Sequence, residues 1–200
     1  MIPAMPDASV LEIGCGRGHT LIALKQRGLA REVTGIELVA LPRASRESAH
    51  IDRYIVANVE TDELDLCAET FDVIVCGDVL EHLNDPWAVV ARLKGWLKRG
   101  GVLVASVPNV REARTLYNLL LRGDFAYRES GVLDRTHLRF FCKRNILSML
   151  QIGGGTIERI ATDIDTKTNW RALLNRITFG LLEEFLVTQY LVVVRKAPAG

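Results

Sequence analysis

The stretch Val10-Leu11-Glu12-Ile13-Gly14-Cys15-Gly16-Arg17-Gly18-His19-Thr20 joins an apolar run to three glycines placed at every second position. A helical pattern follows directly and ends near Gly28. Since glycine allows positive φ and a close approach of the backbone to a ligand, we predict a tight turn between a strand and a helix. The first N–H groups of that helix have no partner inside it, so the turn suits a carboxylate or a hydroxyl-rich ligand.

Two other glycine motifs fit this stretch less well. A phosphate-binding P-loop requires Gly-Lys-Ser/Thr, which is absent, and a dinucleotide fingerprint requires its last glycine where His19 stands. The remaining pattern, Glu-x-Gly-x-Gly-x-Gly, resembles the first motif of the class I S-adenosylmethionine (SAM)-dependent methyltransferases. The resemblance implies SAM as the cofactor, with a nicotinamide-dependent enzyme as the weaker alternative. It assigns five cofactor-binding positions in this stretch: Glu12, Gly14, Cys15, Gly16 and Gly18.

Composition and charge narrow the class of protein. The chain has 200 residues, 48% hydrophobic and 24% charged, which suits one globular domain. A net charge of +1 gives no electrostatic footprint for nucleic acid. No apolar run approaches the ~20 residues of a membrane span, and the N-terminus lacks the pattern of a signal peptide. The four cysteines are widely spaced, so we expect reduced thiols in a cytoplasmic protein.

Apolar strand patterns alternate with helical patterns along the chain, which predicts an α/β fold with a mostly parallel sheet. Strands are expected over 9–14, 32–37, 54–57, 71–76, 102–107, 156–164 and 184–196, and a helix over 40–49 among others. The resemblance implies a Rossmann-like three-layer sandwich with seven strands in the order 3-2-1-4-5-7-6, the last one antiparallel. We expect a single domain over 1–200, with 109–141 as an acceptor-site or lid insertion. The few residues before the first strand leave little room for the N-terminal helix that often caps the cofactor, which points to a fragment of a longer protein or a need for a partner.

Ligands of open α/β sheets bind beyond the carboxyl ends of the strands. Glu37 ends the second strand and is expected to accept both ribose hydroxyls of a nucleoside. Asn58 ends the third strand, where the family usually has an acid against the adenine amine. Its amide oxygen can still accept from an N–H donor, and Glu60 is a candidate to share this task. The same resemblance adds the neighbouring positions Leu38, Val59 and Val79 to the cofactor-binding set.

The fourth strand ends in Cys76-Gly77-Asp78-Val79-Leu80-Glu81-His82-Leu83, which resembles the family's fourth motif. The resemblance places Asp78 near the methionine end of the cofactor. His82 is a candidate catalytic residue that contacts cofactor or substrate, with a helix-capping role as the alternative. Asp78, Glu81 and His82 also resemble metal-binding positions of quinone-pathway O-methyltransferases. Three ligands without a fourth are too few, so we predict no metal.

The segment Leu133-Asp134-Arg135-Thr136-His137-Leu138-Arg139-Phe140-Phe141 resembles a motif of methyltransferases in cell-surface polysaccharide and glycosyl-transfer pathways. His137 is the best candidate for a general base, because imidazole titrates near neutral pH. The alternative is a structural histidine tied to Asp134. The region also carries a basic excess, which indicates either an anionic acceptor or a solvated basic face; it consists of Arg111, Arg114, Arg122, Arg128, Arg135 and Arg139.

The sequence therefore predicts methyl transfer from SAM to an O or N atom of a small-molecule or glycan-type acceptor. The methyl of SAM is already activated, and orientation of the acceptor contributes about 7–11 kcal/mol in well-aligned reactions. The alternative is a domain that binds SAM without catalysis and acts in interaction or regulation. The oligomeric state stays open.

Overall fold

The computed structural model describes residues 7–40, 50–164 and 170–198. Its sheet has seven strands in the order β3-β2-β1-β4-β5-β7-β6. Strand β7 is antiparallel to β5 and β6, and the other described pairs are parallel. This confirms the predicted order and orientation. The strands are β1 Ser9–Ile13, β2 Glu32–Glu37, β3 Arg53–Val56, β4 Phe71–Gly77, β5 Leu97–Pro108, β6 Thr156–Thr162 and β7 Gln189–Arg195.

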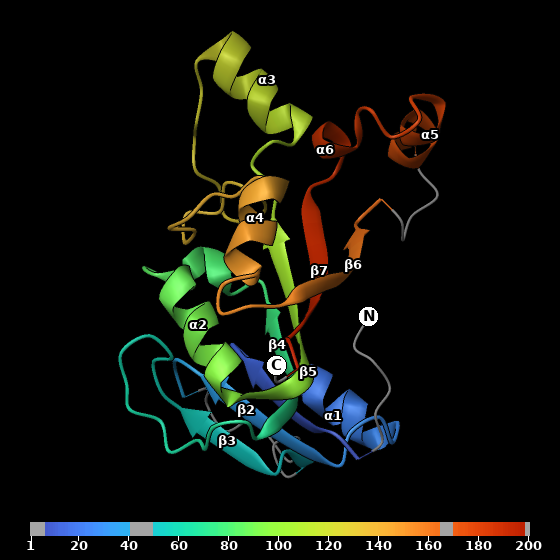
Figure 1. Cartoon of the computed structure of the whole chain (residues 1–200). Helices are drawn as coiled ribbons and strands as arrows, with labels where there is room; N and C mark the ends of the chain where they lie inside the picture. Colours follow the sequence, from blue (N-terminus) through green and yellow to red (C-terminus); the bar gives the residue numbers. More distant parts are fainter. Residues whose placement is uncertain (1–6, 41–49, 165–169, 199–200) are drawn as a thin grey trace.

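Both faces of the sheet are buried, because side chains of the central strands alternate between two hydrophobic clusters. Val73 and Val75 of β4 pack in the cluster that contains α1 (His19–Gln26). Ile74 and Cys76 of β4 pack in the cluster that contains α2 (Pro86–Trp96) and α4 (Lys143–Leu150). Figure 1 shows α2 and α4 together, away from α1. The helices and sheet form the predicted three layers.

Two strand boundaries differ from the prediction. Helix α2 ends at Trp96 and β5 begins directly at Leu97, although the strand was expected to begin at 102. The pairing shifts register between Phe71/Leu97 and Val73/Val102, so Gly100 and Gly101 lie in an irregularity within the strand. The last strand begins at Gln189, later than the expected 184, because the short helix α6 (Glu183–Leu186) comes first. Most of the helix expected over 40–49 lies outside the described residues.

Three helices lie near one end of β5 and β7, away from β3 (Figure 1). They are α3 (Ala113–Arg122), α5 (Trp170–Ile177) and α6. Helix α3 buries the polar residues Thr115 and Asn118 and exposes Leu119, Leu120 and Leu121, Leu120 by 74%. Its inner side is therefore polar. No helix among the described residues combines the length and apolar character needed to cross a membrane.

Candidate active site

The glycine turn has the tight geometry that its sequence predicts. Gly14 has φ +66°, and the N–H groups of Gly14 and Cys15 donate to the carbonyl oxygen of Ile36 at 2.8 and 3.2 Å. Gly18, at φ +75°, precedes the first residue of α1, and its N–H donates to the carbonyl of Cys15 at 2.7 Å. The turn thus ties the end of β1 to β2 and starts α1 within a few residues.

A first cavity of about 400 Å³ lies at the carboxyl ends of β1, β2, β3 and β4. Most of the predicted cofactor-binding residues line it: Gly14, Glu37, Leu38, Asn58, Val59, Asp78 and Val79, together with the candidate catalytic residue His82. The remaining four predicted positions, Glu12, Cys15, Gly16 and Gly18, are not among its lining residues. Their contribution is to shape the turn that supports the cavity.

Glu37 is fixed by the glycine turn. The N–H of Gly16 donates to its Oε2 at 2.7 Å, and the N–H of Leu38 donates to its Oε1 at 2.9 Å. The hydroxyl of Tyr54 in turn donates to the carbonyl of Gly16 at 3.0 Å. Each carboxylate oxygen has further acceptor capacity, so Glu37 can still accept from two ligand hydroxyls.

The polar groups after β3 are already engaged. Oδ1 of Asn58 accepts from the N–H of Glu60 at 2.8 Å and keeps one lone pair, while its amide NH₂ makes no hydrogen bond with a described residue. Glu60 accepts from the N–H of Asp85 at 2.8 Å and from Nδ2 of Asn84 at 3.1 Å. Burial alone would raise the pKa of Glu60, but these donors hold it below its ordinary value. Glu60 therefore lines the first cavity as an ionised carboxylate whose position is fixed by hydrogen bonds from Asn84 and Asp85.

Glu12 lies behind the turn and is almost fully buried, with 7% of its surface exposed. Its Oε2 has no hydrogen-bond partner among the described residues. Burial, opposed by a hydrogen bond from Thr20 and assisted by the charge of Glu37, raises the pKa of Glu12 to about 7. The folded protein therefore holds a proton on Glu12 at pH values where the unfolded chain has lost it.

The Glu12→Gln variant is expected to lose part of the pH dependence of stability. A raised carboxyl pKa stabilises the fold fully below the unfolded value near 4.5, and this contribution is lost as pH rises towards about 7. Wild-type protein should lose about 1.4 kcal/mol per pH unit from Glu12 across that window, and the variant should not. Urea unfolding at several pH values between 5 and 8 measures both slopes; parallel slopes would contradict the buried, protonated Glu12.

A second cavity of about 320 Å³ adjoins the first, since Asp78 and His82 line both. Asp78 follows β4 with φ +55°. Its Oδ1 accepts from Oγ of Ser106 at 2.9 Å and from Nε2 of Gln189. Because Ser106 lies on β5 and Gln189 on β7, the middle of the sheet holds this carboxylate at the junction of the two cavities.

Glu81, His82 and His137 form a titratable cluster in the second cavity. Nδ1 of His82 lies 3.1 Å from the carbonyl oxygen of Thr136, and Nδ1 of His137 lies 3.0 Å from that of Val132. A carbonyl oxygen only accepts, so each Nδ1 donates, and in the neutral form of each ring Nε2 then presents a lone pair. The two rings meet edge to face with centroids 4.8 Å apart.

Glu81 lies under these rings and is 1% exposed. Its Oε1 is 3.9 Å from Nε2 of His137, and neither carboxyl oxygen has a hydrogen-bond partner among the described residues. Burial raises the pKa of Glu81 to about 8, with the charge of Asp78 adding to the shift. The backbone carbonyl of Glu81 accepts from the N–H groups of Leu138 and Arg139, which ties the His137 segment to the sheet.

The cluster differs from the metal positions suggested by sequence. Ligand atoms of Glu81, His82 and His137 lie within 4.8 Å of one another, whereas Asp78 is hydrogen-bonded to Ser106 and Gln189. Two imidazoles and a carboxylate are a ligand set that suits several divalent metals. The absence of a metal stays a prediction, as does the catalytic role of either histidine.

Sequence reasoning missed two features of this site. It considered Glu81 only as a metal ligand, although an acid within the apolar run Val79–Leu83 is itself a signal of a buried carboxyl group. It gave no role to Gln189, which is 111 positions from Asp78 and carries no local motif. The imidazole of His137 is tied to Val132, while Oδ1 of Asp134, its partner in the structural alternative, accepts from Thr136; the two residues are joined through the backbone, where the N–H of His137 donates to the carbonyl oxygen of Asp134 at 3.0 Å.

Comparison with known proteins gives the family. Residues 3–155 match the family model described as "Methyltransferase domain". The ubiquinone biosynthesis O-methyltransferase of Xanthomonas campestris is 34% identical over 144 residues, covering 63% of this chain and 57% of that protein. The protein of the same name from Glaesserella parasuis is 32% identical over 127 residues, covering 60% and 52%. The matched region thus spans about half the length of these curated relatives.

Solved structures agree on the fold. A putative methyltransferase from Bacillus halodurans has a TM-score of 0.68 at 17% identity, covering 98% of this chain and 95% of that one. A SAM-dependent methyltransferase from Mesorhizobium loti has a TM-score of 0.62 at 16% identity, covering 97% and 93%. The narrower resemblance to polysaccharide-pathway enzymes stays a prediction. The matched family model and the sheet order show that this chain belongs to the methyltransferase-domain family and has the fold of class I SAM-dependent methyltransferases.

Proposed function

We propose that this protein transfers a methyl group from SAM to a hydroxyl oxygen of a small-molecule acceptor. The observation that carries the proposal is the junction of the first and second cavities at Asp78 and His82. One cavity has the carboxylates and glycine turn that suit a nucleoside with an ammonium group. The other has imidazole nitrogens that suit a hydroxyl proton. The O-methyltransferase names of the relatives support oxygen over nitrogen.

The residues of the first cavity fit SAM by charge and position. Glu37, at the end of β2, can accept from the ribose hydroxyls, and Asn58 can pair with the adenine edge through the second lone pair of its Oδ1 or through its amide NH₂. Asp78 presents a carboxylate for the ammonium group next to the second cavity. When bound, SAM supplies a methyl group already activated by its sulfonium.

His82 is the residue that we assign to the acceptor proton. Its Nδ1–H is held by the carbonyl of Thr136, so its Nε2 is the accepting nitrogen, and it lines both cavities. His137 packs against its ring and orients it. The raised pKa of Glu81 keeps that buried carboxyl protonated at neutral pH, which leaves the imidazole as the base. Segment 109–141, which carries His137, serves in this proposal as the acceptor-site insertion.

The first experiment is calorimetric titration with S-adenosylhomocysteine and, separately, with NAD. We expect S-adenosylhomocysteine to bind and to raise the melting temperature of the protein, since a ligand that binds the native state stabilises that state. NAD should do neither. Binding followed by methylation of a hydroxylated aromatic acid or sugar nucleotide would support the whole proposal. Binding without turnover on any acceptor would favour the non-catalytic SAM-binding alternative, and binding of NAD alone would overturn the cofactor assignment.

A further inference from the structure

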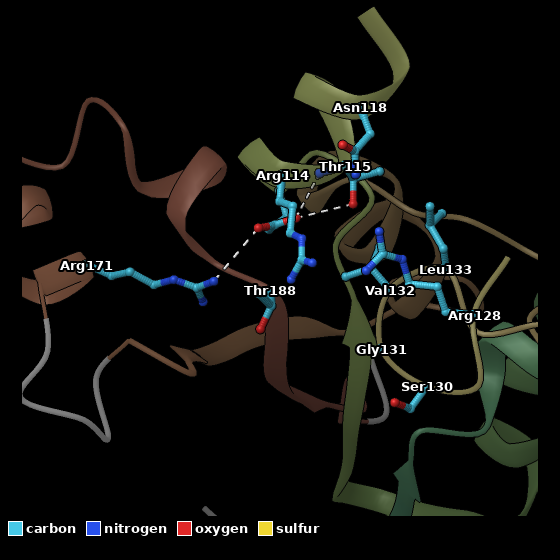
Figure 2. A pocket seen from close by; sticks show the side chains of 11 residues that line it. Arg114, Thr115, Asn118, Arg128, Ser130, Gly131, Val132, Leu133, Arg171 and Thr188 are labelled. Carbon is cyan, nitrogen blue, oxygen red and sulfur yellow. Dashed lines mark hydrogen bonds and ion pairs between the residues drawn. The ribbon is translucent and has the colours of Figure 1, made fainter. Parts of the chain in front are cut away.

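A third cavity of about 250 Å³ lies between α3, the segment 128–133 and α5. Figure 2 shows its side chains, with Arg114 reaching in from α3 and Arg128 from the opposite wall. The described residues that line it are Glu112, Arg114, Thr115, Asn118, Arg128, Ser130, Gly131, Val132, Leu133, Arg171 and Thr188. Three arginines therefore converge on one small space.

The charge of this third cavity is positive after its internal pairing is counted. Glu112 is its only acidic lining residue, and its Oε1 lies 3.8 Å from Arg171. The other oxygen of Glu112 accepts from the N–H and Oγ1 of Thr115, at 3.0 and 3.2 Å. The guanidinium groups of Arg114 and Arg128 make no ion pair with a described residue. Two positive charges thus remain for a ligand.

Asn118 gives a second and independent indication of a ligand. It is 7% exposed and lines the third cavity, yet its side-chain amide forms no hydrogen bond with any described residue. Asn118 is not among the described residues whose side-chain polar atoms are both fully buried and unpartnered, so its amide opens onto the third cavity, where a ligand or water can pair with it. Helix α3 turns this amide inwards while Leu119, Leu120 and Leu121 are exposed. The polar inner side of α3 has the composition of a binding wall.

The third cavity adjoins the second along Gly131, Val132 and Thr188, which line both. The carbonyl of Val132 also holds Nδ1 of His137. A molecule that places a hydroxyl at His82 can therefore extend past this wall towards Arg114 and Arg128.

We propose that the third cavity binds an oxyanion group, carboxylate or phosphate, carried by the methyl acceptor. The inference rests on the proposed function only where it names the methyl acceptor as the ligand. The oxyanion site itself is argued from the residues of the third cavity. Guanidinium groups present planar N–H donors that match carboxylate and phosphate oxygens, and the NH₂ of Asn118 adds a neutral donor. This site would select acceptors with an anionic group remote from the methylated hydroxyl.

The test is titration calorimetry with two probes, phenyl phosphate and benzoate, in low-salt buffer free of phosphate. We expect wild-type protein to bind at least one probe, and its chemical class identifies the oxyanion. The Arg114→Gln/Arg128→Gln double variant should bind it about tenfold or more weakly, because charge-assisted hydrogen bonds are lost. Asn118→Leu should weaken binding less. The matched control is Arg122→Gln, since Arg122 is on the same helix but outside the third cavity, over the ring of Tyr117.

Each protein is also titrated with S-adenosylhomocysteine, whose affinity should be equal in all variants and shows that the fold is intact. Equal probe binding by wild type and the double variant would overturn the oxyanion site, as would no binding of either probe to wild type. If the probe binds in a manner that depends on the two arginines but wild-type protein does not bind S-adenosylhomocysteine, the proposed methyl transfer is overturned and the oxyanion site stands.

Discussion

The Gly14→Ala variant is expected to bind S-adenosylhomocysteine on the order of 100-fold more weakly than wild type, as measured by calorimetry. Gly14 has φ +66°, and a Cβ atom there would lie 2.5 Å from Cγ2 of Val79. Both residues line the first cavity, so any shift that relieves this contact changes the shape of the cavity. The expected loss combines backbone strain with a displaced wall.

Gly28→Ala is the matched control for that strain. Gly28 has φ +65°, nothing lies within 4 Å of a Cβ added there, and the residue follows α1 far from the cavity lining. It should lose about 1 kcal/mol of stability from the same backbone conformation and retain nucleoside affinity. If Gly14→Ala binds as well as Gly28→Ala, the first cavity is not the cofactor site.

The His82→Ala variant is expected to have a kcat about 10²–10⁴-fold lower than wild type, measured with an acceptor that the wild-type protein methylates. This is the range expected for the loss of a general base. Affinity for S-adenosylhomocysteine should change much less, because Glu37, Asn58 and Asp78 remain. His137→Ala should give a smaller loss, since His137 orients the His82 ring. Steady-state kinetics and calorimetry on the same preparations separate these effects.

His50→Ala is the control, because His50 is exposed and outside the described cavities. A second control is dialysis of wild-type protein against EDTA, which should not change its rate of methyl transfer. A rate that falls with EDTA and returns with Mg²⁺ or Zn²⁺ would assign Glu81, His82 and His137 to a metal instead. A His82→Ala enzyme with wild-type kcat would remove His82 from the reaction.

The parts of the fold that follow from local pattern could be predicted from the sequence. The glycine turn and the acid at the end of β2 each depend on neighbouring residues, and both lie where expected. The sheet order came from the family resemblance, because spacing alone does not fix which strands are neighbours.

The parts that depend on distant contacts could not be predicted. Strand β5 begins at Leu97 because Phe71 pairs with it, and Asp78 is held by Gln189 from the far end of the chain. Helix α3 buries Thr115 and Asn118 and leaves Leu119 and Leu120 exposed. Whether a helix buries its apolar or its polar side depends on what the rest of the fold places beside it.

The position of β7 has a consequence for folding and aggregation. β7 lies between β5 and β6, and β6 has no other strand neighbour among the described residues. A folding intermediate that has not inserted β7 therefore exposes one edge of β5 and leaves β6 unpaired, and such edges readily pair between molecules. Substitutions that slow the insertion of β7 should increase aggregation during refolding more than they lower the stability of the native state.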